Sequence, residues 1–541
     1  MKIPSYVVVV PTVGRPCLQE CLDALDKAVS AGAFAPRQVV LADDRRDTPD
    51  PLPVAVPAEL ADLVTEVTLE GRGPATARNT GWRAAVPSEW VVFLDDDVLV
   101  TPEWAEQLAA DLAGAAPDVG GVQGVIEVPW RHGSRPADSQ RATLRLASAP
   151  WITADMAYRR AALADVGGFD ERFPRAYRED SDLALRVRDL GWSLRRGRRR
   201  AEHPVRPANP WASIRAQAGN ADDAAMRRQH GPDWRRRAGA AAGRRSVHLT
   251  TCALGAGAVL LAGVATVGNA ATRGGITATR GGITATRGGI AARRAAVVCA
   301  SGWLGLTAEF AARRIAAGPR TWRETGAMLA TSAVIPPLAA WHWLAGTWRA
   351  RDAGPWPPAP TAVLFDRDGT LVHDVPYNTD PALVTPVPGA AEALAALRRA
   401  GVRVGVVSNQ SGVGRGIITP AQLSAVNSRV EELLGPFSTW QVCTHRADAG
   451  CACRKPGPGL ITAAADALGV TTAQCVVIGD IAADVAAARA AGARGILVPA
   501  PQTSAGDLIG VPSAESLGEA VAAILAGRPL PSWHGAGKET R

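Results

Sequence analysis

Apolar residues gather in short runs, separated by longer stretches with periodic apolar positions, in the first and the last third of the chain. Leu18, Leu22 and Leu25, for example, recur at helical spacing after the first run. The runs predict buried strands at 6–10, 38–42, 90–94, 362–365, 404–407 and 475–479. Strands that alternate with helices predict two α/β domains on doubly wound sheets, with ligands at the carboxyl edges of the strands.

The middle of the chain follows a different pattern. Residues 247–267 are nearly all apolar, and about 20 such residues can span a bilayer. The apolar run at 295–310 is shorter, and the run at 326–348 is interrupted by two adjacent prolines. These runs predict an apolar and basic helical region at 241–354.

A heptapeptide, TRGGITA, is repeated at 272–292, where its third copy reads TRGGIAA. A pair of glycines in every heptad argues against a stable helix and predicts a low-complexity linker. A proline-rich stretch at 354–360 predicts a second, stiffer linker. We therefore expect domains at 1–240 and 355–541, on either side of the helical region.

Positive charge bears on whether the middle region crosses a membrane. The net charge is +8, and arginine occurs in every stretch that would connect spanning helices, at Arg273, Arg280, Arg287, Arg313, Arg314 and Arg320. Whichever connection lies outside would break the positive-inside tendency. Helices that lie on the membrane surface avoid this conflict, with arginines at lipid phosphates and tryptophans at the interface. The alternative is a soluble helical extension packed on the first domain.

Composition narrows the class of protein further. No helix-turn-helix, zinc-finger array or RRM-like pattern accompanies the basic clusters, so we expect no nucleic-acid partner. Eight cysteines among 541 residues do not make a disulfide scaffold. The apolar run at 6–10 is too short for a signal peptide and leads straight into Pro11. We expect a cytoplasmic protein with reduced thiols, associated with the cytoplasmic face of a membrane.

The candidate chemistry of the last third begins with Asp366 and Asp368, which directly follow the run at 362–365. Two carboxylates two residues apart at a strand end can point into one crevice, with Arg367 turned away. One can attack phosphorus, while the other protonates the leaving oxygen and then deprotonates the attacking water. An acidic loop without function would give the same short pattern.

Three later residues strengthen the interpretation as a phosphoryl-transfer site. Ser408, after the strand predicted at 404–407, offers a hydroxyl to phosphoryl oxygens. Lys455, in CRKP, offers a point positive charge. Asp480 follows the strand predicted at 475–479, and a carboxylate there suits Mg2+, which prefers oxygen ligands.

Three of the eight cysteines lie with a histidine in a window of eleven residues, as Cys443, His445, Cys451 and Cys453. A Cys3His set in a short loop is the signature of a structural zinc site. Metal binding in this loop would fix Arg454 and Lys455, which follow the last ligand. We therefore expect zinc to have a structural role and no catalytic one.

The four motifs of this part, each at the carboxyl end of a strand, resemble those of the haloacid dehalogenase (HAD) phosphatase superfamily over about 360–525. The resemblance implies a HAD Rossmann-like domain in which Asp366 is the nucleophile and Asp368 the acid/base. It also implies that Ser408 and Lys455 stabilise the phosphoryl group. Mg2+ would be bound by Asp366, the main-chain carbonyl of Asp368 and Asp480.

Within the superfamily, the zinc-ligand loop and the stretches DRDGTL, SNQSGVGRG and CRKP closely resemble the heptose 1,7-bisphosphate phosphatases, which remove the 7-phosphate. Histidinol-phosphate phosphatases share the zinc pattern and are the alternative, together with other small-molecule phosphatases. The stretches DVPYN and NQSGVGRG look more like the heptose enzymes and imply a substrate site with Tyr377, Asn409, Gln410 and Arg454. Arg454 would bind the distal phosphate, because a guanidinium fork suits it.

The chemistry of the first third lies in acids at strand ends. Asp43 could accept hydrogen bonds from a nucleotide base or ribose, and Asp95–Asp97 could hold Mg2+ or Mn2+ against a diphosphate. A glycine-rich turn that enters a helix with Arg78 suits phosphate. Further along, Asp180 could deprotonate an acceptor hydroxyl, although it or its neighbour could also cap the helix predicted at 183–190.

The ordered set PTVGRP, LADD, GPATARN, FLDDD, GGFDE and REDSDLALR resembles the inverting family 2 glycosyltransferases of the GT-A fold over about 5–235. The resemblance implies a nucleotide-sugar donor, a glycan acceptor, Mg2+ or Mn2+ at Asp95 and Asp97, and Asp180 as the base. Arg45 and Arg46 follow the LADD acids at positions where the family usually has small polar residues. This departs from the family pattern for contacts with the nucleotide base. The chain then fuses a glycosyltransferase to a sugar-phosphate phosphatase; the alternative makes the N-terminal half a non-catalytic binding module.

Overall fold

The computed structural model describes residues 4–31, 34–46, 50–131, 133–207, 209–273, 281–351, 356, 360–527 and 530. For residues 267–273 and 281–288 it describes the backbone alone. The chain forms two compact units. One consists of Met1–Ile126, Trp151–Glu202 and Gly354–Arg541, and the other of Glu127–Pro150 and His203–Ala353. The first unit contains both β-sheets, and the second contains the three longest helices.

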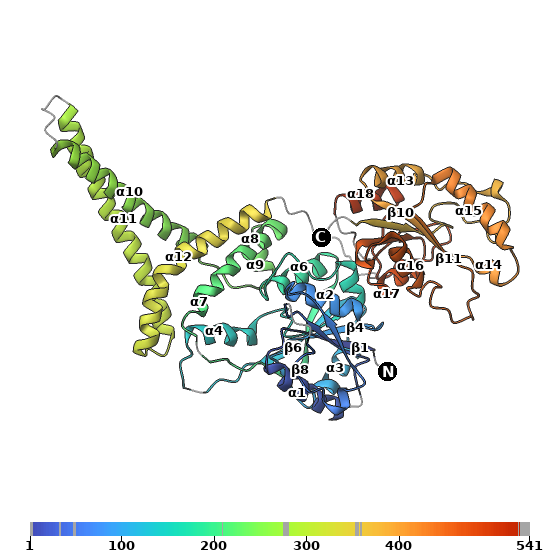
Figure 1. The fold of residues 1–541 in the computed structure, drawn as a ribbon, viewed down its shortest axis with the longest axis horizontal. Helices are drawn as coiled ribbons and strands as arrows, with labels where there is room; N and C mark the ends of the chain where they lie inside the picture. Colours follow the sequence, from blue (N-terminus) through green and yellow to red (C-terminus); the bar gives the residue numbers. More distant parts are fainter. Residues whose placement is uncertain are drawn as a thin grey trace. The chain divides into compact units, whose positions relative to one another are not determined.

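An eight-stranded mixed sheet lies in the N-terminal part of the first unit (Figure 1), in the order β3-β2-β1-β4-β7-β6-β8-β5. The strands are β1 (Tyr6–Thr12), β2 (Val39–Asp43), β3 (Val64–Thr68), β4 (Trp90–Leu94), β5 (Leu99–Val100), β6 (Val119–Glu127), β7 (Asp155–Arg159) and β8 (Ser193–Glu202). The three strands predicted in this part are confirmed. β1 runs parallel to β2 and β4, whereas β7 runs antiparallel to β4.

Helices cover this sheet and place the glycine-rich turn at its carboxyl edge. They are α1 (Cys17–Ala31), α2 (Pro74–Ala84), α3 (Trp104–Ala113), α5 (Arg160–Asp165) and α6 (Glu179–Asp189). α2 lies so close to β1 that a Cβ at Gly81 would meet Val9 Cγ1 at 2.5 Å. Buried Trp82 on the same helix belongs to the main apolar core of this sheet.

A five-stranded parallel sheet of order β11-β10-β9-β12-β13 forms the centre of the C-terminal part. The strands are β9 (Ala362–Phe365), β10 (Arg403–Asn409), β11 (Thr439–Cys443), β12 (Cys475–Gly479) and β13 (Arg494–Leu497). Successive residues of β9 enter different cores: Val363 and Phe365 pack on one face of the sheet, and Ala362 and Leu364 on the other. Both faces are therefore buried, which explains the unbroken apolar runs that predicted these strands.

The helices of the C-terminal part follow these strands and cover the sheet. They are α13 (Ala390–Arg399), α14 (Ser411–Gly414), α15 (Pro420–Leu434), α16 (Gly459–Leu468), α17 (Ala482–Ala490) and α18 (Leu517–Leu525). The capping box of α15 joins Thr419 and Gln422, which fixes where that helix begins.

The second unit is helical. Its helices are α4 (Asp138–Leu144), α7 (Ala212–Arg215), α8 (Gly219–His230), α9 (Trp234–Arg237), α10 (Arg245–Arg273), α11 (Gly281–Ala317) and α12 (Trp322–Ala350). α10 and α11 lie side by side as a hairpin (Figure 1), with Gly255 facing Trp303 and Leu254 facing Gly302. Two segments, Arg245–Thr266 and Gly289–Ala317, are long and apolar enough by length and composition to cross a membrane.

Two expectations for this region were wrong. The repeat was expected to be a linker, but α11 begins at Gly281 and includes residues 281–292; residues 274–280 lie outside the described part. Beyond the repeat, α11 packs on α10, where Gly302 faces Leu254, and such packing stabilises a helix more than its intrinsic propensity does. Arg314, expected in a connecting loop, is buried within α11 and donates to Thr331 Oγ1 (2.7 Å) and Asp138 Oδ2 (2.7 Å).

Candidate active sites

The carboxyl ends of β9, β10 and β12 bring the predicted phosphatase residues to one edge of the C-terminal sheet. Phe365 pairs in register with Val406 and Ile478, and the Asp366 amide donates to the Ile478 carbonyl at 2.9 Å. Asp366 and Asp480 are buried there, and one oxygen of each lies within 4.8 Å of the other. The parallel register thus assembles acids that are more than 100 residues apart in the sequence.

Lys455 is the cation of this cluster. Its buried Nζ lies 2.9 Å from Asp366 Oδ1, 2.5 Å from Asp484 Oδ1 and 3.0 Å from the Val407 carbonyl. Burial alone would lower the pKa of Lys455, but the two carboxylates raise it above its usual value. Burial and the neighbouring acids raise the pKa of Asp366, against the opposing effect of Lys455.

Asp484 had no role assigned from the sequence, yet it is fully buried in this cluster. Its position depends on Gly479, because a Cβ there would meet Asp484 Oδ2 at 2.2 Å. Burial, and then the charge of Asp484, raises the pKa of Asp480 to about 6. The only signal in the sequence was the spacing of four residues between Asp480 and Asp484, which places the second acid on the first turn of α17.

The two residues that follow Ser408 contact the loop of Lys455 and the predicted acid Asp368. Asn409 makes two hydrogen bonds to the main chain of Lys455: its Nδ2 donates to the carbonyl and its Oδ1 accepts from the amide, both at 3.1 Å. Gln410 Nε2 donates to Asp368 Oδ2 at 2.6 Å and to Ser408 Oγ at 3.0 Å. Both amides, predicted to bind substrate, are thus hydrogen-bonded in this structure to residues with a predicted catalytic role.

Tyr377 and Arg454 lie outside this cluster of acids. Tyr377 is 45% exposed, and its hydroxyl accepts from Arg415 Nη1 at 2.9 Å. Arg454 Nη1 is buried and has no hydrogen-bond partner among the residues that the structure describes. A buried guanidinium nitrogen without a partner fits a residue that binds an anion, so the predicted role of Arg454 stays open to test.

The four predicted zinc ligands meet in one place. Their ligating atoms all lie within 4.8 Å of one another. The sulfur atoms are 3.4 to 3.7 Å apart, and His445 Nδ1 is 3.6 Å from Cys443 Sγ and 3.3 Å from Cys453 Sγ. A tetrahedral zinc ion with Zn–S bonds of about 2.3 Å places its sulfur ligands about 3.8 Å apart. The donor set and its spacing therefore fit a zinc ion.

The oxygen donors of the phosphatase site also fit a metal. Asp366, Asp480 and Asp484 converge with only Lys455 to balance their charge among the described residues. Three carboxylates against one ammonium leave an excess of negative charge, and carboxylate oxygens suit Mg2+. Lys455 lies nearer to Asp484 Oδ1 (2.5 Å) than to Asp366 Oδ1 (2.9 Å), so Asp366 and Asp480 keep more of their negative charge for the ion.

In the N-terminal domain, arginines pair with the acids that follow β4. Arg78 Nη2 donates to Asp95 Oδ1 at 2.7 Å. Asp96, the acid between the two predicted ligands, is buried and accepts from Thr12 Oγ1 (2.8 Å) and Arg15 Nε (3.2 Å). Arg15 Nη1 also lies 3.6 Å from Asp97 Oδ2. Sequence reasoning missed Arg15, whose only signal was its place in PTVGRP just after β1.

Arg78, expected to bind phosphate, is buried between two acids. Besides Asp95, it donates from Nη1 to Glu179 Oε1 at 2.9 Å, and its guanidinium lies over the Phe169 ring, 5.6 Å from the centroid. It therefore connects the end of β4 to the start of α6. Burial and the neighbouring Asp180 raise the pKa of Glu179 against the opposing effect of Arg78.

Asp180 does not cap a helix, so that alternative was wrong. α6 begins at Glu179 after Arg178, which adopts a left-handed conformation with φ of 77° and provides no side-chain cap. Asp180 lies in the first turn, where its Oδ1 accepts from the Ser181 amide at 2.6 Å. Burial raises the pKa of Asp180, which favours a carboxylate able to accept a proton.

The LADD acids are also engaged. Arg45 binds both oxygens of buried Asp43, with Nη2 2.7 Å from Oδ2. This contact gives Arg45, which departs from the family pattern, a role in holding Asp43. The predicted contact of Asp43 with a nucleotide has no support in this structure. Asp44 accepts from the Arg72 and Gly73 amides at 2.7 and 2.8 Å, which holds the glycine-rich turn.

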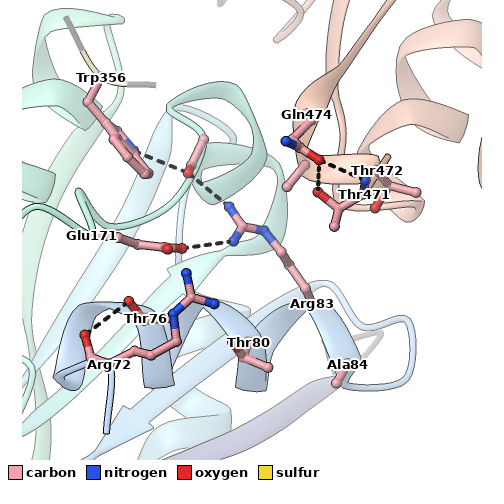
Figure 2. A pocket seen from close by; sticks show the side chains of 12 residues that line it. Arg72, Thr76, Thr80, Arg83, Ala84, Glu171, Trp356, Thr471, Thr472 and Gln474 are labelled. Carbon is pink, nitrogen blue, oxygen red and sulfur yellow. Dashed lines mark hydrogen bonds and ion pairs between the residues drawn. The ribbon is translucent and has the colours of Figure 1, made fainter. Parts of the chain in front are cut away.

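Figure 2 shows the side chains beyond that turn. Arg83 Nη2 donates to the Gly167 carbonyl at 3.1 Å, and Trp356 Nε1 donates to the same carbonyl at 3.3 Å. Thr76 Oγ1 donates to the Arg72 carbonyl at 3.4 Å. The Thr76 contact lies in the first turn of α2 and the Arg83 contact in its last turn, so both ends of the helix that carries Arg78 are held.

Comparisons with known proteins match two separate parts of the chain to two different families. Residues 377–492 match the model for haloacid dehalogenase-like hydrolases, and residues 7–167 match that for Glycosyl transferase family 2. Both families use divalent metal ions. A D-glycero-beta-D-manno-heptose-1,7-bisphosphate 7-phosphatase of Mesorhizobium japonicum is 37% identical over 166 residues, which are 28% of this chain and 76% of that protein. The enzyme of the same name from Pseudomonas putida is 36% identical over 145 residues, 25% of this chain and 81% of the relative.

A mannosyltransferase from Pyrobaculum calidifontis, solved with GDP-Man and Mn2+, is similar at 20% identity and a TM-score of 0.30, over 65% of this chain and 88% of its own. That TM-score is too low to support an assignment. The assignment rests instead on the two family matches and on the curated relatives. The chain belongs to the family of the D-glycero-beta-D-manno-heptose-1,7-bisphosphate 7-phosphatases through its C-terminal HAD domain, which is fused to an N-terminal family 2 glycosyltransferase domain.

Proposed function

We propose that the C-terminal domain, residues 355–541, removes the 7-phosphate of D-glycero-D-manno-heptose 1,7-bisphosphate. The observation that carries this proposal is the cluster of Asp366, Lys455 and Asp480 at one sheet edge, in a domain whose relatives bear that name. Asp366 attacks phosphorus, and the bond to the ester oxygen breaks. The proton for the leaving oxygen comes from Asp368.

Water then attacks the phosphorus of the aspartyl-phosphate and gives a proton to Asp368; the bond from phosphorus to Asp366 breaks, which frees the Asp366 carboxylate and phosphate. Ser408 and Lys455 stabilise the phosphoryl oxygens throughout. Mg2+, held by Asp366, the Asp368 carbonyl and Asp480, would neutralise the phosphoryl charge and orient it for attack. Zn2+ at the Cys3His loop has a structural role, because its last ligand, Cys453, lies two residues before Lys455 and the ion would hold the loop that carries this lysine.

Phosphate release from a panel of sugar phosphates by the full-length protein tests the proposal. Heptose 1,7-bisphosphate should be hydrolysed with the highest kcat/KM, and Asp366→Asn should be inactive on every compound. Preference for histidinol phosphate would replace the heptose assignment with the alternative. Failure to release phosphate from any ester in the presence of Mg2+ would overturn the phosphatase proposal itself.

For the N-terminal domain, residues 1–240, we propose transfer of a sugar from a nucleotide-sugar donor to a glycan acceptor. Asp95 and Asp97 would hold Mg2+ or Mn2+ against the donor diphosphate, and Asp180 would deprotonate the acceptor hydroxyl. Arg78, which pairs with Asp95, and Arg15, which lies near Asp97, support the assignment of the metal site because they hold these two carboxylates at the carboxyl edge of the sheet. A heptose 1-phosphate released by the phosphatase and activated by other enzymes would be a suitable source of donor.

Association with the cytoplasmic face of a membrane through residues 241–354 is a third proposal. Apolar side chains on the α10–α11 hairpin are unusually exposed: Val259 is 73% exposed, Leu260 70% and Val298 70%. Soluble proteins rarely expose such a contiguous apolar surface. A basic and an aromatic side chain also stack in this region: the guanidinium carbon of Arg245 lies 4.9 Å from the centroid of the Trp343 ring. Arginine and tryptophan side chains are suited to the headgroup region of a membrane.

Flotation of the full-length protein with vesicles of phosphatidylcholine and phosphatidylglycerol tests this association. The protein should float with the vesicles, and the double variant L260D/V298D should not. Equal flotation of parent and variant, or a soluble dimer that hides the hairpin, would contradict it. Phosphatase activity of the variant shows whether it is folded.

A further inference from the structure

Arg367, between the two catalytic aspartates, does not turn away from them. Alternation at a strand end predicts that it points to the opposite side. Instead its side chain is 4% exposed and returns to Asp368, with Nε 2.9 Å from Oδ1 and Nη2 2.9 Å from Oδ2. A paired contact of this kind between guanidinium and carboxylate is among the strongest and most directional hydrogen-bonded arrangements.

The other end of this guanidinium is fixed by a different element. Arg367 Nη1 donates to the side-chain oxygen of Asn427, on α15, at 2.6 Å. The Arg367 carbonyl accepts from the amides of Leu371 and Val372, both at 3.0 Å, so the backbone of the turn is held as well. Each of its three side-chain nitrogens therefore donates a hydrogen bond to another side chain of the protein.

The Asp368 carboxylate thus receives hydrogen bonds from two directions. Arg367 binds both of its oxygens, and Gln410 Nε2 donates to Oδ2 at 2.6 Å. Asp368 itself is 27% exposed, which leaves it accessible to a leaving group. A general acid has to keep its oxygen within hydrogen-bond reach of the departing atom, so its orientation controls how well it donates.

We propose that Arg367, fixed by Asn427, is a positioning residue that orients Asp368 for proton transfer to the leaving alcohol. The proposal rests on the phosphatase function proposed above. When Asp366 bonds to phosphorus and the ester bond breaks, the electron pair stays on the ester oxygen, which takes the proton of Asp368. Arg367 touches neither phosphorus nor the ester oxygen.

Leaving groups of different basicity separate orientation of the acid from a general structural effect. An alkyl phosphate needs protonation of its leaving oxygen, whereas p-nitrophenolate leaves without it. We expect Asn427→Ala and Arg367→Gln to lower kcat/KM for a sugar phosphate about 10- to 100-fold, a part of what general acid catalysis contributes. kcat/KM for p-nitrophenyl phosphate should fall by less than about threefold. This constant covers only the steps through ester cleavage, so hydrolysis of the aspartyl-phosphate does not affect the comparison.

Two further variants complete the test. Ser428→Ala, at the exposed neighbour on α15, is the matched control and should leave both constants unchanged. In an Asp368→Asn background, Arg367→Gln should add little, because the group that it orients has lost its proton. Equal losses on both substrates, or full additivity with Asp368→Asn, would overturn the inference. Asn427→Ala keeps the test decisive if Arg367→Gln does not fold, and an inactive parent protein would instead point to failure of the proposed function.

Discussion

The two candidate active sites hold their acids in different ways. In the HAD domain, three buried carboxylates converge on one ammonium, that of Lys455, so the negative charge is concentrated in one place. In the transferase domain, the acids that follow β4 are divided between two guanidinium groups: Arg78 pairs with Asp95, and Arg15 pairs with Asp96 and lies near Asp97. An ammonium acts as a point charge that several acids share, whereas a guanidinium holds each carboxylate that it contacts in a defined orientation.

This difference has a consequence for catalysis. The phosphatase cluster has unbalanced charge at the place where a dianionic phosphoryl group must be received, so it depends on a cation for that step. The transferase acids are oriented by arginines from the turn after β1 and from α2, whose positions come from the packing of the sheet. We therefore expect the phosphatase to be more sensitive to loss of one acid, and the transferase to loss of its framework.

The largest effect is expected from Asp366→Asn. The amide cannot form an aspartyl-phosphate, so phosphate release should fall roughly 10⁴-fold or more, as when a nucleophile is removed from a catalytic unit. Donor binding by the transferase, measured by calorimetry, should be unchanged. Asp466→Asn, at an exposed acid on α16, is the control. Turnover near that of the parent would refute Asp366 as the nucleophile.

On the transferase side, Asp180→Ala or Asp97→Ala should reduce sugar transfer without affecting phosphate release. Loss of a general base costs on the order of 10²- to 10⁴-fold, and we expect Asp180→Ala to fall in this range. Asp97→Ala should also weaken donor binding in the presence of Mn2+, since it acts through the metal. If either variant loses phosphatase activity, the two sites are coupled and the contrast drawn between them fails.

Much of both sites could be predicted from the sequence, because their acids directly follow strands that short apolar runs reveal. β9 was predicted residue for residue, and Asp366 follows it. The partners of these acids could not be predicted in the same way. Arg15 is 81 residues from Asp96, and Asn427 is 60 residues from Arg367, so each contact depends on how distant elements pack.

Local rules also failed where tertiary packing opposed them. Asp180 looks like a cap because acids favour helix N-termini, but α6 begins one residue earlier, after a left-handed Arg178. The glycine pairs of the repeat predict a linker, yet α11 includes residues 281–292 beside α10. In both places the local preference, for a helix cap or against glycine in a helix, is worth about 2 kcal/mol or less and did not decide the structure.

A smaller loss of activity should follow removal of zinc. Cys451→Ser should abolish the approximately one zinc ion per chain expected from elemental analysis, because it removes a ligand of the Cys3His set. The loop that carries Lys455 would then lose its support. A displacement of about 1 Å can cost about 10²-fold in rate, so we expect a phosphatase loss of that order. Cys475→Ser, outside the cluster, is the control. A folded, fully active and zinc-free protein would exclude the site.

The smallest effect concerns substrate choice. Arg454 Nη1 is buried and lacks a partner in the described part of the chain, so a second phosphate would give it one. A hydrogen bond to a charged group contributes about 1.5–3 kcal/mol, and 1.4 kcal/mol is a factor of ten. Arg454→Ala should therefore lower kcat/KM for heptose 1,7-bisphosphate about 10- to 100-fold.

The same variant should change little on a heptose 7-phosphate, which lacks the distal group, and that compound is the internal control. The selectivity between the two substrates isolates the contact from any general damage to the Lys455 loop, because such damage would slow both. Protonated histidinol phosphate presents an amine, which Arg454 would repel. Arg454→Ala should therefore leave kcat/KM for histidinol phosphate unchanged or raise it. Equal losses on bisphosphate and monophosphate would show that Arg454 supports the loop and does not read the distal phosphate.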